Sequence, residues 1–235
     1  GTGVNTSVGY KTVNSAPTGQ IQSWSVSSPS GSYGKNWTYT YDQKGNITAI
    51  SDGSQTVTYQ YDGQNQLTRE NNPYAGKTWI YQYDDGGNIL SKTEYAYTTG
   101  SVSGTGNAVT YEYDSEWKDL LEEYNGTAVS SDSIGNITAL GTRTFTWEHG
   151  RQLASATNGS TSVTYSYDAD GLRTGKTVGS TQTKYYYLGT QLTDMTVGSV
   201  AMHFSYDELG PESVTYNGAT YYYVKNLQGD VVAIL

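Results

Sequence analysis

Cysteine, histidine and positive charge are scarce in this sequence of 235 residues, and each scarcity excludes a class of chemistry. The absence of cysteine excludes disulfide bridges and thiolate metal sites. The two histidines, His149 and His203, are too few for a zinc site and fall into no Ser-His-Asp arrangement. We therefore expect no metal, no other cofactor and no enzymatic activity.

The charge balance argues against nucleic acid as a partner. Lys and Arg total 13 against 22 Asp and Glu, which gives a net charge of −9, and the basic residues form no cluster. Binding to a phosphate backbone requires clustered Lys and Arg, so we expect no nucleic acid partner. Long hydrophobic runs are absent as well. None approaches the roughly 18 residues that a membrane-spanning helix needs, and we expect no membrane insertion.

The residues that are present favour strands and turns. Gly occurs 28 times, Ser, Thr and Asn are abundant, and no window shows the apolar stripe of an amphipathic helix. Hydrophobic residues make up only 35% of the chain, and 24 tyrosines are prominent among them. A tyrosine ring is largely apolar, and its hydroxyl can bind a partner or water at the edge of a core. The composition predicts an all-β chain in which tyrosine is the main core-forming residue.

One stretch, YTYDQKGNITAI at Tyr39–Ile50, sets the pattern for the rest of the sequence. Tyr39 and Tyr41 are two residues apart, so on a strand their rings point to the same face. The Asp42 carboxylate can accept hydrogen bonds from backbone amides two residues on. Gly45 and Asn46, three and four residues after it, are residue types that tolerate positive φ. The stretch therefore predicts a β-hairpin corner with a return strand that begins at Ile47.

Copies of this motif recur in two alternating forms, one with Gly-Asn-Ile after the acid and one that returns on Leu. Successive acidic positions at 42, 62, 84, 114, 132, 148 and 168 define a unit of about 20 residues, and two units would make about 40. Such periods are typical of solenoids, propellers and other arrays. The residues assigned to the structural motif are Tyr39, Tyr41, Asp42, Gly45, Asn46, Tyr59, Tyr61, Asp62, Tyr81, Tyr83, Asp84, Gly87, Asn88, Tyr111, Tyr113, Asp114, Gly135, Asn136, Tyr165, Tyr167, Asp168 and Gly171.

The pattern divides the chain into residues 1–35, a degenerate lead-in segment or first repeat, and residues 36–235, the repeat array. Residues 98–107 (TTGSVSGTGN) are predicted to be a loop that bulges at a hairpin end. Asn217-Gly218 is a type I′ turn signal between aromatic strands. The last strand, Val231–Leu235, is apolar, and an array with such an uncapped end is expected to be a fragment of a longer one.

The alternation of Y-x-Y-D-x-x-G-N-I with Y-x-Y-D-x-x-x-x-L, from Tyr39 to the C-terminus, resembles the YD-repeat, or RHS-repeat, family of large secreted and surface proteins. The final stretch YYYVKNLQGDVVAIL resembles the segment that closes the array in bacterial members. The resemblance implies a strip of consecutive β-hairpins that spirals into a shell, which encloses a toxic domain in bacterial polymorphic toxins and forms a barrel in the teneurins. The self-cleaving Asp segment of bacterial shells has no matching positions here, so no catalytic residue is carried over.

The function that this resemblance implies is structural. The chain would be a non-catalytic segment of a secreted or cell-surface protein whose targeting signal lies outside these residues. Its partner would be an enclosed or downstream C-terminal effector domain.

Two sets of residues leave other hypotheses open. The repeated carboxylates could line a Ca²⁺ site or a catalytic cleft, although each is expected to serve its own turn and the dense D-x-D-x-D spacing of calcium loops is absent. The aromatic rows could make the chain an adhesin, a carbohydrate- or partner-binding module that stacks cell-surface glycans on exposed rings. Packing between hairpins is the other role for the same rings. The candidates for glycan stacking are Trp24, Trp37, Trp79, Trp117 and Trp147.

Overall fold

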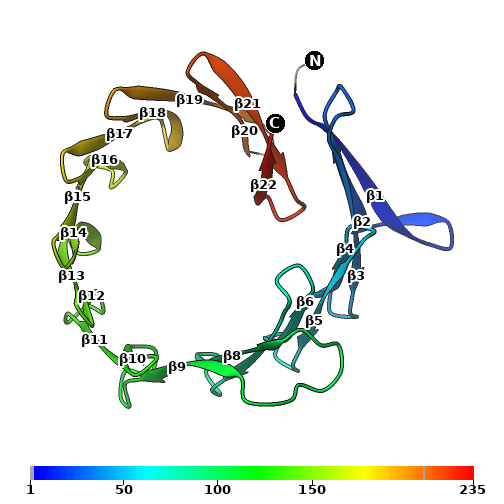
Figure 1. The fold of residues 1–235 in the computed structure, drawn as a ribbon, viewed down its shortest axis with the longest axis horizontal. Coiled ribbons are helices and arrows are strands. Elements are labelled where there is room, and N and C mark those ends of the chain that lie inside the picture. The colour runs from blue at the N-terminus through cyan, green and yellow to red at the C-terminus, as the bar shows by residue number, and fades with distance from the viewer. Residues whose placement is uncertain (1–2, 209) are drawn as a thin grey trace. The chain divides into compact units, whose positions relative to one another are not determined.

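The structure is a computed structural model that describes residues 3–208 and 210–235. These residues form strands, turns and loops, and none of them lies in a helix. Successive strands pair antiparallel within two stretches of the chain, residues 5–124 and 127–234, and Figure 1 shows the hairpins that they form. The prediction of an all-β chain of tandem hairpins is confirmed.

The chain divides into two compact units, residues 1–126 and 127–235. In the first unit ten strands pair in chain order, each with the next. They are β1 (Asn5–Val13), β2 (Ala16–Ser27), β3 (Gly34–Tyr41), β4 (Ile47–Ser51), β5 (Thr56–Tyr61), β6 (Leu67–Asn72), β7 (Lys77–Tyr83), β8 (Ile89–Ala96), β9 (Asn107–Tyr113) and β10 (Leu121–Tyr124). The predicted lead-in segment thus holds β1 and β2, and β2 pairs directly with the first motif strand.

The second unit repeats this arrangement with twelve strands, again paired in chain order. They are β11 (Thr127–Ser131), β12 (Ile137–Leu140), β13 (Arg143–Glu148), β14 (Gln152–Asn158), β15 (Thr161–Tyr167), β16 (Arg173–Val178), β17 (Thr181–Leu188), β18 (Gln191–Val197), β19 (Val200–Asp207), β20 (Gly210–Tyr216), β21 (Ala219–Lys225) and β22 (Val231–Ile234). Asn217 and Gly218 have φ values of 50° and 76°, which confirms the predicted type I′ turn between β20 and β21.

A register shift recurs immediately before the second aromatic residue of each motif. Thr40 pairs with Ala49, but Tyr41 pairs with Ile47, so Thr48 is the extra residue of a β-bulge. A bulge disturbs the ladder locally, and the backbone groups beside it need other partners. The same shift precedes Tyr61, Tyr83, Trp147, Tyr167, Tyr187 and Tyr206.

Side chains alternate between two faces of the sheet. In β15, Val163, Tyr165 and Tyr167 are half-buried, whereas Thr164 and Ser166 between them are exposed. We call the side that carries the motif tyrosines the aromatic face and the other side the opposite face. Few apolar side chains are buried in the described part of the chain. They are Trp24, Val26, Tyr39, Val57 and Val224.

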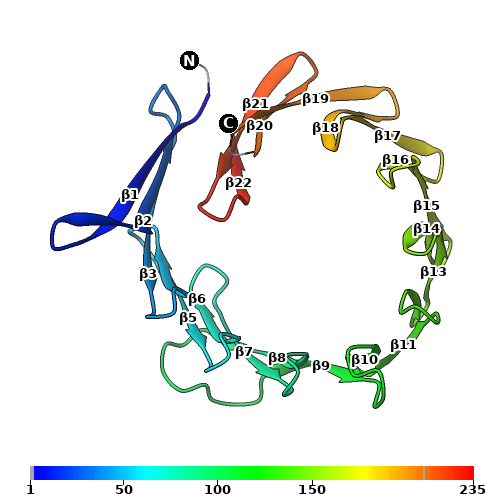
Figure 2. The same cartoon turned by 180° about the vertical axis from the view of Figure 1, so that it is seen from behind.

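The connection between β8 and β9, residues 97–106, is visible as a long loop in Figure 2. It does not simply bulge at a hairpin end, as the sequence predicts. Arg69 on β6 donates through Nη2 to the carbonyls of Thr98 and Gly100, at 2.9 and 2.6 Å. The hydroxyl of Thr78 on β7 donates to the carbonyl of Thr98 and accepts from its N–H, both at 3.0 Å. Thr78 is fully buried, so the loop is fastened over the opposite face of unit 1.

Candidate functional site

The best-defined constellation is the hairpin corner that follows each motif strand. At Asp42, Oδ1 accepts from the N–H groups of Lys44 and Asn46, both at 2.9 Å, and Oδ2 accepts from the side-chain amide of Asn46 at 2.9 Å. The backbone closes the corner, because the N–H of Asp42 donates to the carbonyl of Asn46 and the N–H of Gly45 donates to the carbonyl of Asp42. Each oxygen of the carboxylate is therefore engaged within its own turn.

The two motif forms, which the sequence suggests are different, share this geometry. Asp62 accepts from the N–H groups of Gln64 and Gln66 at 2.8 and 2.9 Å, as Asp42 does from its own partners. Asn65 has φ 67° and takes the place of Gly45, which has φ 91°. The left-handed residue is thus the third after the Asp in both forms. Asn46, also expected to tolerate positive φ, does not adopt it and instead serves as a side-chain donor to the carboxylate.

The same corner recurs at Asp84, Asp132 and Asp168, each with a glycine at positive φ three residues later. Those glycines are Gly87, Gly135 and Gly171.

Two corners depart from the pattern. After Asp114 the turn is longer, since the N–H of Asp114 donates to the carbonyl of Leu120 and Oδ1 accepts from the N–H groups of Glu116 and Trp117. At Glu148 the corner uses two left-handed residues, His149 and Gly150, with φ 46° and 84°. These departures occur where the motif lacks its Asp or its five-residue spacing.

Hydrogen bonds to the carboxylates hold several of these acids in the charged form. The side-chain amide of Asn46 is the largest influence that lowers the pKa of Asp42, and Asn88 plays the same part for Asp84. For Asp114 the backbone N–H of Trp117 lowers the pKa most. These hydrogen bonds favour the charged form of each carboxylate and fix it within its own turn.

Neighbouring corners are joined by side chains along one edge of the sheet. In unit 1 the Asn46 amide donates to Oδ1 of Asn65 at 3.0 Å, and Lys44 Nζ donates to the carbonyl of Gly63 at 2.6 Å. In unit 2 the Asn136 amide donates to the carbonyl of Gly150 at 2.7 Å. These contacts join the corners at Asp42 and Asp62 in unit 1 and the corners at Asp132 and Glu148 in unit 2.

A second set of contacts joins each hairpin to the one before it. The second aromatic residue of a motif donates a hydrogen bond to a backbone carbonyl of the preceding hairpin. The acceptor lies at or next to the start of the return strand, except for Ile21, which lies within β2. At Trp147 the indole N–H replaces the tyrosine hydroxyl. We call these contacts the aromatic ladder. They are Tyr41 to Ile21, Tyr61 to Ile47, Tyr83 to Leu67, Tyr113 to Ile89, Trp147 to Ile137, Tyr167 to Leu153, Tyr187 to Arg173 and Tyr206 to Leu192, at 2.6 to 3.1 Å.

Sequence reasoning missed a corner near the C-terminus. The N–H of Asn226 donates to the carbonyl of Asp230, Gly229 has φ 88°, and Oδ1 of Asn226 accepts from the N–H of Asp230 at 2.9 Å. The amide of Asn226 also donates to Oδ2 of Asp230 at 3.0 Å. The acid and the amide have exchanged places relative to Asp42 and Asn46, and the glycine three residues after Asn226 was the available signal.

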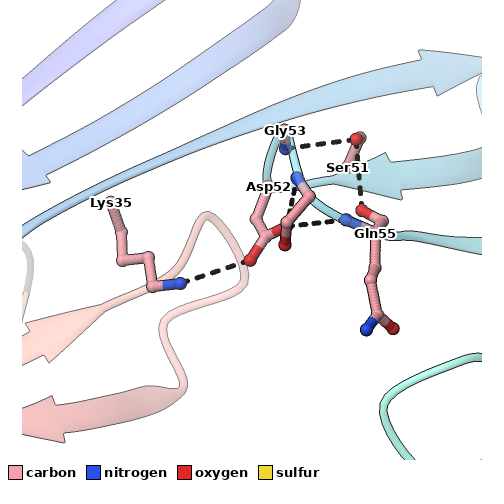
Figure 3. Close-up of polar contacts among 6 residues, drawn as sticks. Lys35, Ser51, Asp52, Gly53 and Gln55 are labelled. Carbon is pink, nitrogen blue, oxygen red and sulfur yellow. Dashed lines mark hydrogen bonds and ion pairs between the residues drawn. The ribbon is translucent and has the colours of Figure 1, made fainter.

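A second missed residue, Asp52, lies in the turn between β4 and β5 (Figure 3). Its Oδ1 accepts from the N–H groups of Ser54 and Gln55 at 3.0 and 3.1 Å, and Lys35 Nζ lies 3.2 Å from its Oδ2. The hydroxyl groups of Tyr74 and Ser54, followed by these amides, hold the pKa of Asp52 well below its usual range. The Asp-Gly dipeptide was the signal for this turn.

Neither a metal site nor a membrane-spanning helix is found in the described ranges 3–208 and 210–235. No group of three or more His, Asp or Glu side chains there is placed to hold a metal ion. No helix there is long and apolar enough to cross a membrane.

The RHS Repeat family profile matches residues 41–75 and 61–102, which contain the corners at Asp42, Asp62 and Asp84. This part of the chain is similar to the RHS repeat. Its sequence is 34% identical over 122 residues to the tRNA3(Ser)-specific nuclease WapA of Bacillus spizizenii, a match that takes up 48% of this chain and 5% of WapA.

Solved structures show the same fold as these RHS repeats. The Photorhabdus luminescens Tc holotoxin pore matches with a TM-score of 0.61 and 15% identity over 100% of this chain. The TcdB2-TccC3 complex crystallised without its hypervariable C-terminal region matches with a TM-score of 0.60 and 14% identity over 99%. This chain spans only 14% of the length of either matched chain.

The RHS hairpins do not bring the five tryptophans into one row. Trp24 is buried and pairs across the strands with Trp37, while the indole N–H of Trp147 belongs to the aromatic ladder. Trp117 is 46% exposed in the long corner after Asp114. Trp79 is half-buried on β7, with Lys92 Nζ 5.1 Å from its ring centroid. Glycan stacking by these residues stays a prediction.

Proposed function

We propose that this RHS-repeat chain is a non-catalytic, structural segment of a secreted or cell-surface protein, and that its hairpins form part of a β shell. In this proposal the shell encloses or presents a C-terminal effector domain of the same protein. The structural role is supported by the hydrogen bonds of the polar side chains. The motif Asp carboxylates accept hydrogen bonds within their own corners, and the ladder hydroxyls donate to the preceding hairpin.

The comparisons support two parts of this proposal, a C-terminal effector domain and a secreted parent protein. The solved neighbours are toxin assemblies, and the description of one of them mentions a hypervariable C-terminal region. WapA is a nuclease, and the match to this chain occupies a small part of it. In the proposal the nuclease activity of such a relative lies outside the RHS repeats, which supply the enclosure. The repeat-motif residues named above have structural roles, with no catalytic or metal-binding part.

The proposal is tested on the full-length product of the gene that encodes this chain. We expect the region after residue 235 to resist limited proteolysis when the repeats are folded, and to be cut rapidly when Gly45→Val weakens the Asp42 corner and Tyr61→Phe removes the ladder contact to Ile47. The matched control is Trp117→Ala, which alters an exposed ring outside the ladder. A gene that encodes no domain after residue 235, or a domain cut equally fast in all three proteins, would contradict enclosure.

Catalysis by the repeats is tested separately. Residues 1–235 alone are expected to leave tRNA intact under conditions in which the full-length protein is assayed. Cleavage by the isolated repeats, lost in a motif Asp variant that remains folded, would overturn the non-catalytic assignment.

A further inference from the structure

Tyr111 on β9 and Tyr124 on β10 pair directly across the two strands, on the aromatic face of unit 1. Their rings meet edge to face, with centroids 5.4 Å apart and an interplanar angle of 71°, so carbons of the two rings are in contact. In the other motif hairpins of the described residues, the residue that pairs with the first aromatic residue is not aromatic. These residues are Ile50, Glu70, Lys92, Ala156, Lys176, Met195 and Val214.

The ladder that this pair belongs to is short. It contains three residue pairs with a register shift after Leu121, whereas seven residue pairs join β7 to β8. On the opposite face Glu112 pairs with Glu123, and like charges that pair directly across two strands destabilise a sheet. The turn that connects the two strands is the long corner after Asp114. Strand β10 is therefore weakly held, and an additional link to β9 would stabilise it.

Tyrosine is the residue type through which a covalent link can form here, because the chain has no cysteine. Neither Tyr111 nor Tyr124 makes a side-chain hydrogen bond within the described residues, so both hydroxyls can release a proton to water. Tyr124 keeps 38% of its surface exposed, and both rings border a groove of about 400 Å³ that Trp79 also lines. An oxidant can therefore reach the pair from solvent.

We propose that Tyr111 and Tyr124 form a site of oxidative cross-linking, at which a carbon–carbon bond between the two rings joins β9 to β10. The oxidant is hydrogen peroxide that acts through a haem peroxidase. This modification strengthens the repeats themselves and does not depend on the enclosure of an effector domain.

The reaction removes two electrons and two protons from the pair. Each phenol loses one electron and one proton and becomes a phenoxyl radical. Rotation about the last side-chain torsion, which is broad for tyrosine, brings together the ring carbons ortho to the two hydroxyls, and the radicals couple there. The hydrogens on those carbons then move to the phenol oxygens as protons, which restores both aromatic rings. The electrons and protons released in the first step convert one hydrogen peroxide into two water molecules.

The proposal is tested on residues 1–235, treated at low protein concentration with a haem peroxidase and limiting hydrogen peroxide. The monomer is then separated by size exclusion, which removes links between molecules. We expect dityrosine fluorescence in the monomer, and a proteolytic fragment in which Tyr111 is joined to Tyr124. Its mass should be lower than the sum of the two separate peptides by two hydrogen atoms. Oxidation of Met195 or Met202 is distinguished by mass, because it adds oxygen.

Tyr111→Phe and Tyr124→Phe should each abolish the linked fragment, because phenylalanine keeps the ring but has no phenol to oxidise. Tyr216→Phe is the matched control. Tyr216 is also 38% exposed and lies in unit 2, so its replacement should leave the linked fragment unchanged.

Amide hydrogen exchange measures what the link does to the fold. Exchange in β10 should slow by about tenfold or more in the linked protein, because the strand can no longer separate from β9. The same treatment of Tyr124→Phe should produce no such change. The proposal is overturned if the oxidised wild-type monomer contains no fragment that joins Tyr111 to Tyr124, or if the link forms and exchange in β10 stays the same.

Discussion

The hydroxyl of Tyr61 donates a hydrogen bond of 2.9 Å to the carbonyl of Ile47, a residue 14 positions earlier in the chain. Ile47 is the first residue after a corner and adjoins the bulge at Thr48, where the regular ladder is disturbed. The tyrosine of one hairpin therefore provides a partner for the backbone of the previous one. This relationship explains why the motif needs an aromatic residue that also carries a donor at its second aromatic position.

Removing one donor from the ladder should cost stability without altering the fold. We expect Tyr61→Phe to lower the free energy of unfolding by about 0.5 to 2 kcal/mol, because a partly buried carbonyl loses its partner while the ring stays in place. Chemical denaturation followed by circular dichroism measures the change. Tyr97→Phe, at a ring that is 40% exposed and outside the ladder, is the control. Equal loss in both variants would show that the hydroxyl of Tyr61 has no special role.

The left-handed position of the corner should discriminate between residue types. Gly45 has φ 91° and open space where a Cβ would lie, so backbone strain alone decides the outcome. We expect Gly45→Val to cost roughly 1 to 3 kcal/mol, since a β-branched residue is least tolerated at positive φ. Gly45→Asn should cost less, because Asn65 already adopts φ 67° at the same place in the next corner. If Val and Asn proved equally tolerated in denaturation experiments, the corner geometry would be wrong.

Acid should destabilise the array through its corners. The pKa values of Asp42, Asp84 and Asp114 are lowered by hydrogen bonds in the fold, so the folded state favours their charged form. The contribution of these acids to the stability of the fold is present above the unfolded pKa of about 3.9. It is lost as the pH falls through their lower folded pKa values. Thermal midpoints measured from neutral pH to about pH 2 should decrease in this window. Asp84→Asn should begin with a lower midpoint and show a shallower decrease. A midpoint that is constant with pH would contradict charged corners.

Two tyrosines should titrate late in alkali. Burial, followed by the charge of Glu70, raises the pKa of Tyr59 and of Tyr81 to about 12. The folded state holds these protons more tightly than the unfolded chain. The contribution of the two tyrosines to stability is therefore fully present below about pH 10 and is lost as the pH rises toward 12. Tyr59 and Tyr81 should therefore contribute to the late part of the rise in tyrosinate absorbance. Glu70→Gln should bring both to lower pH, and Glu112→Gln, an exposed acid on β9, should not.

The position of the loop between β8 and β9 should depend on Gly106, because there is no room for a side chain there. A Cβ at Gly106 would lie 2.5 Å from Cγ2 of Thr93 and 2.7 Å from the ring of Tyr95. Gly106→Ala is therefore expected to displace residues 97–106 and to speed amide exchange and proteolysis there. Gly104→Ala, in the same loop with no atom near its Cβ, is a comparison in which only the φ of 77° is strained. Faster exchange in Gly104→Ala than in Gly106→Ala would contradict the contact.

The repeat spacing was enough to predict the hairpins, because Y-x-Y fixes a face and Asp fixes the turn that follows. The backbone carbonyls that accept hydrogen bonds from the tyrosine hydroxyls could not be predicted. Their position depends on a bulge at residues such as Thr48, and the repeated motif ends at Ile47, one residue before that bulge. The corner at Asn226 was missed for a related reason, since a motif written as Asp followed by Asn hides the fact that either order satisfies the same donors and acceptors.

The groove on the aromatic face of unit 1, lined in part by Trp79 and Tyr124, escaped prediction because its lining comes from four strands. Trp79 and Tyr124 are 45 positions apart in the sequence and line one groove only through the pairing of β7, β8, β9 and β10. The loop at residues 97–106 was placed correctly by its composition. Its fastening by Arg69 was not foreseen, since an arginine in a strand is ordinarily expected to face water.

The aromatic ladder also determines where residues can be inserted without disturbing the fold. Donor and acceptor are 10 residues apart at Trp147 and 24 apart at Tyr113, yet both make the same contact, because the difference is absorbed by the connections at the edge away from the corners. Insertions at that edge are therefore neutral to the architecture, whereas a single residue inserted within a strand would turn every later ring of that strand to the wrong face. The edge away from the corners can therefore accept loops of different lengths, whereas the corners at Asp42, Asp62, Asp84, Asp132 and Asp168 keep one turn geometry.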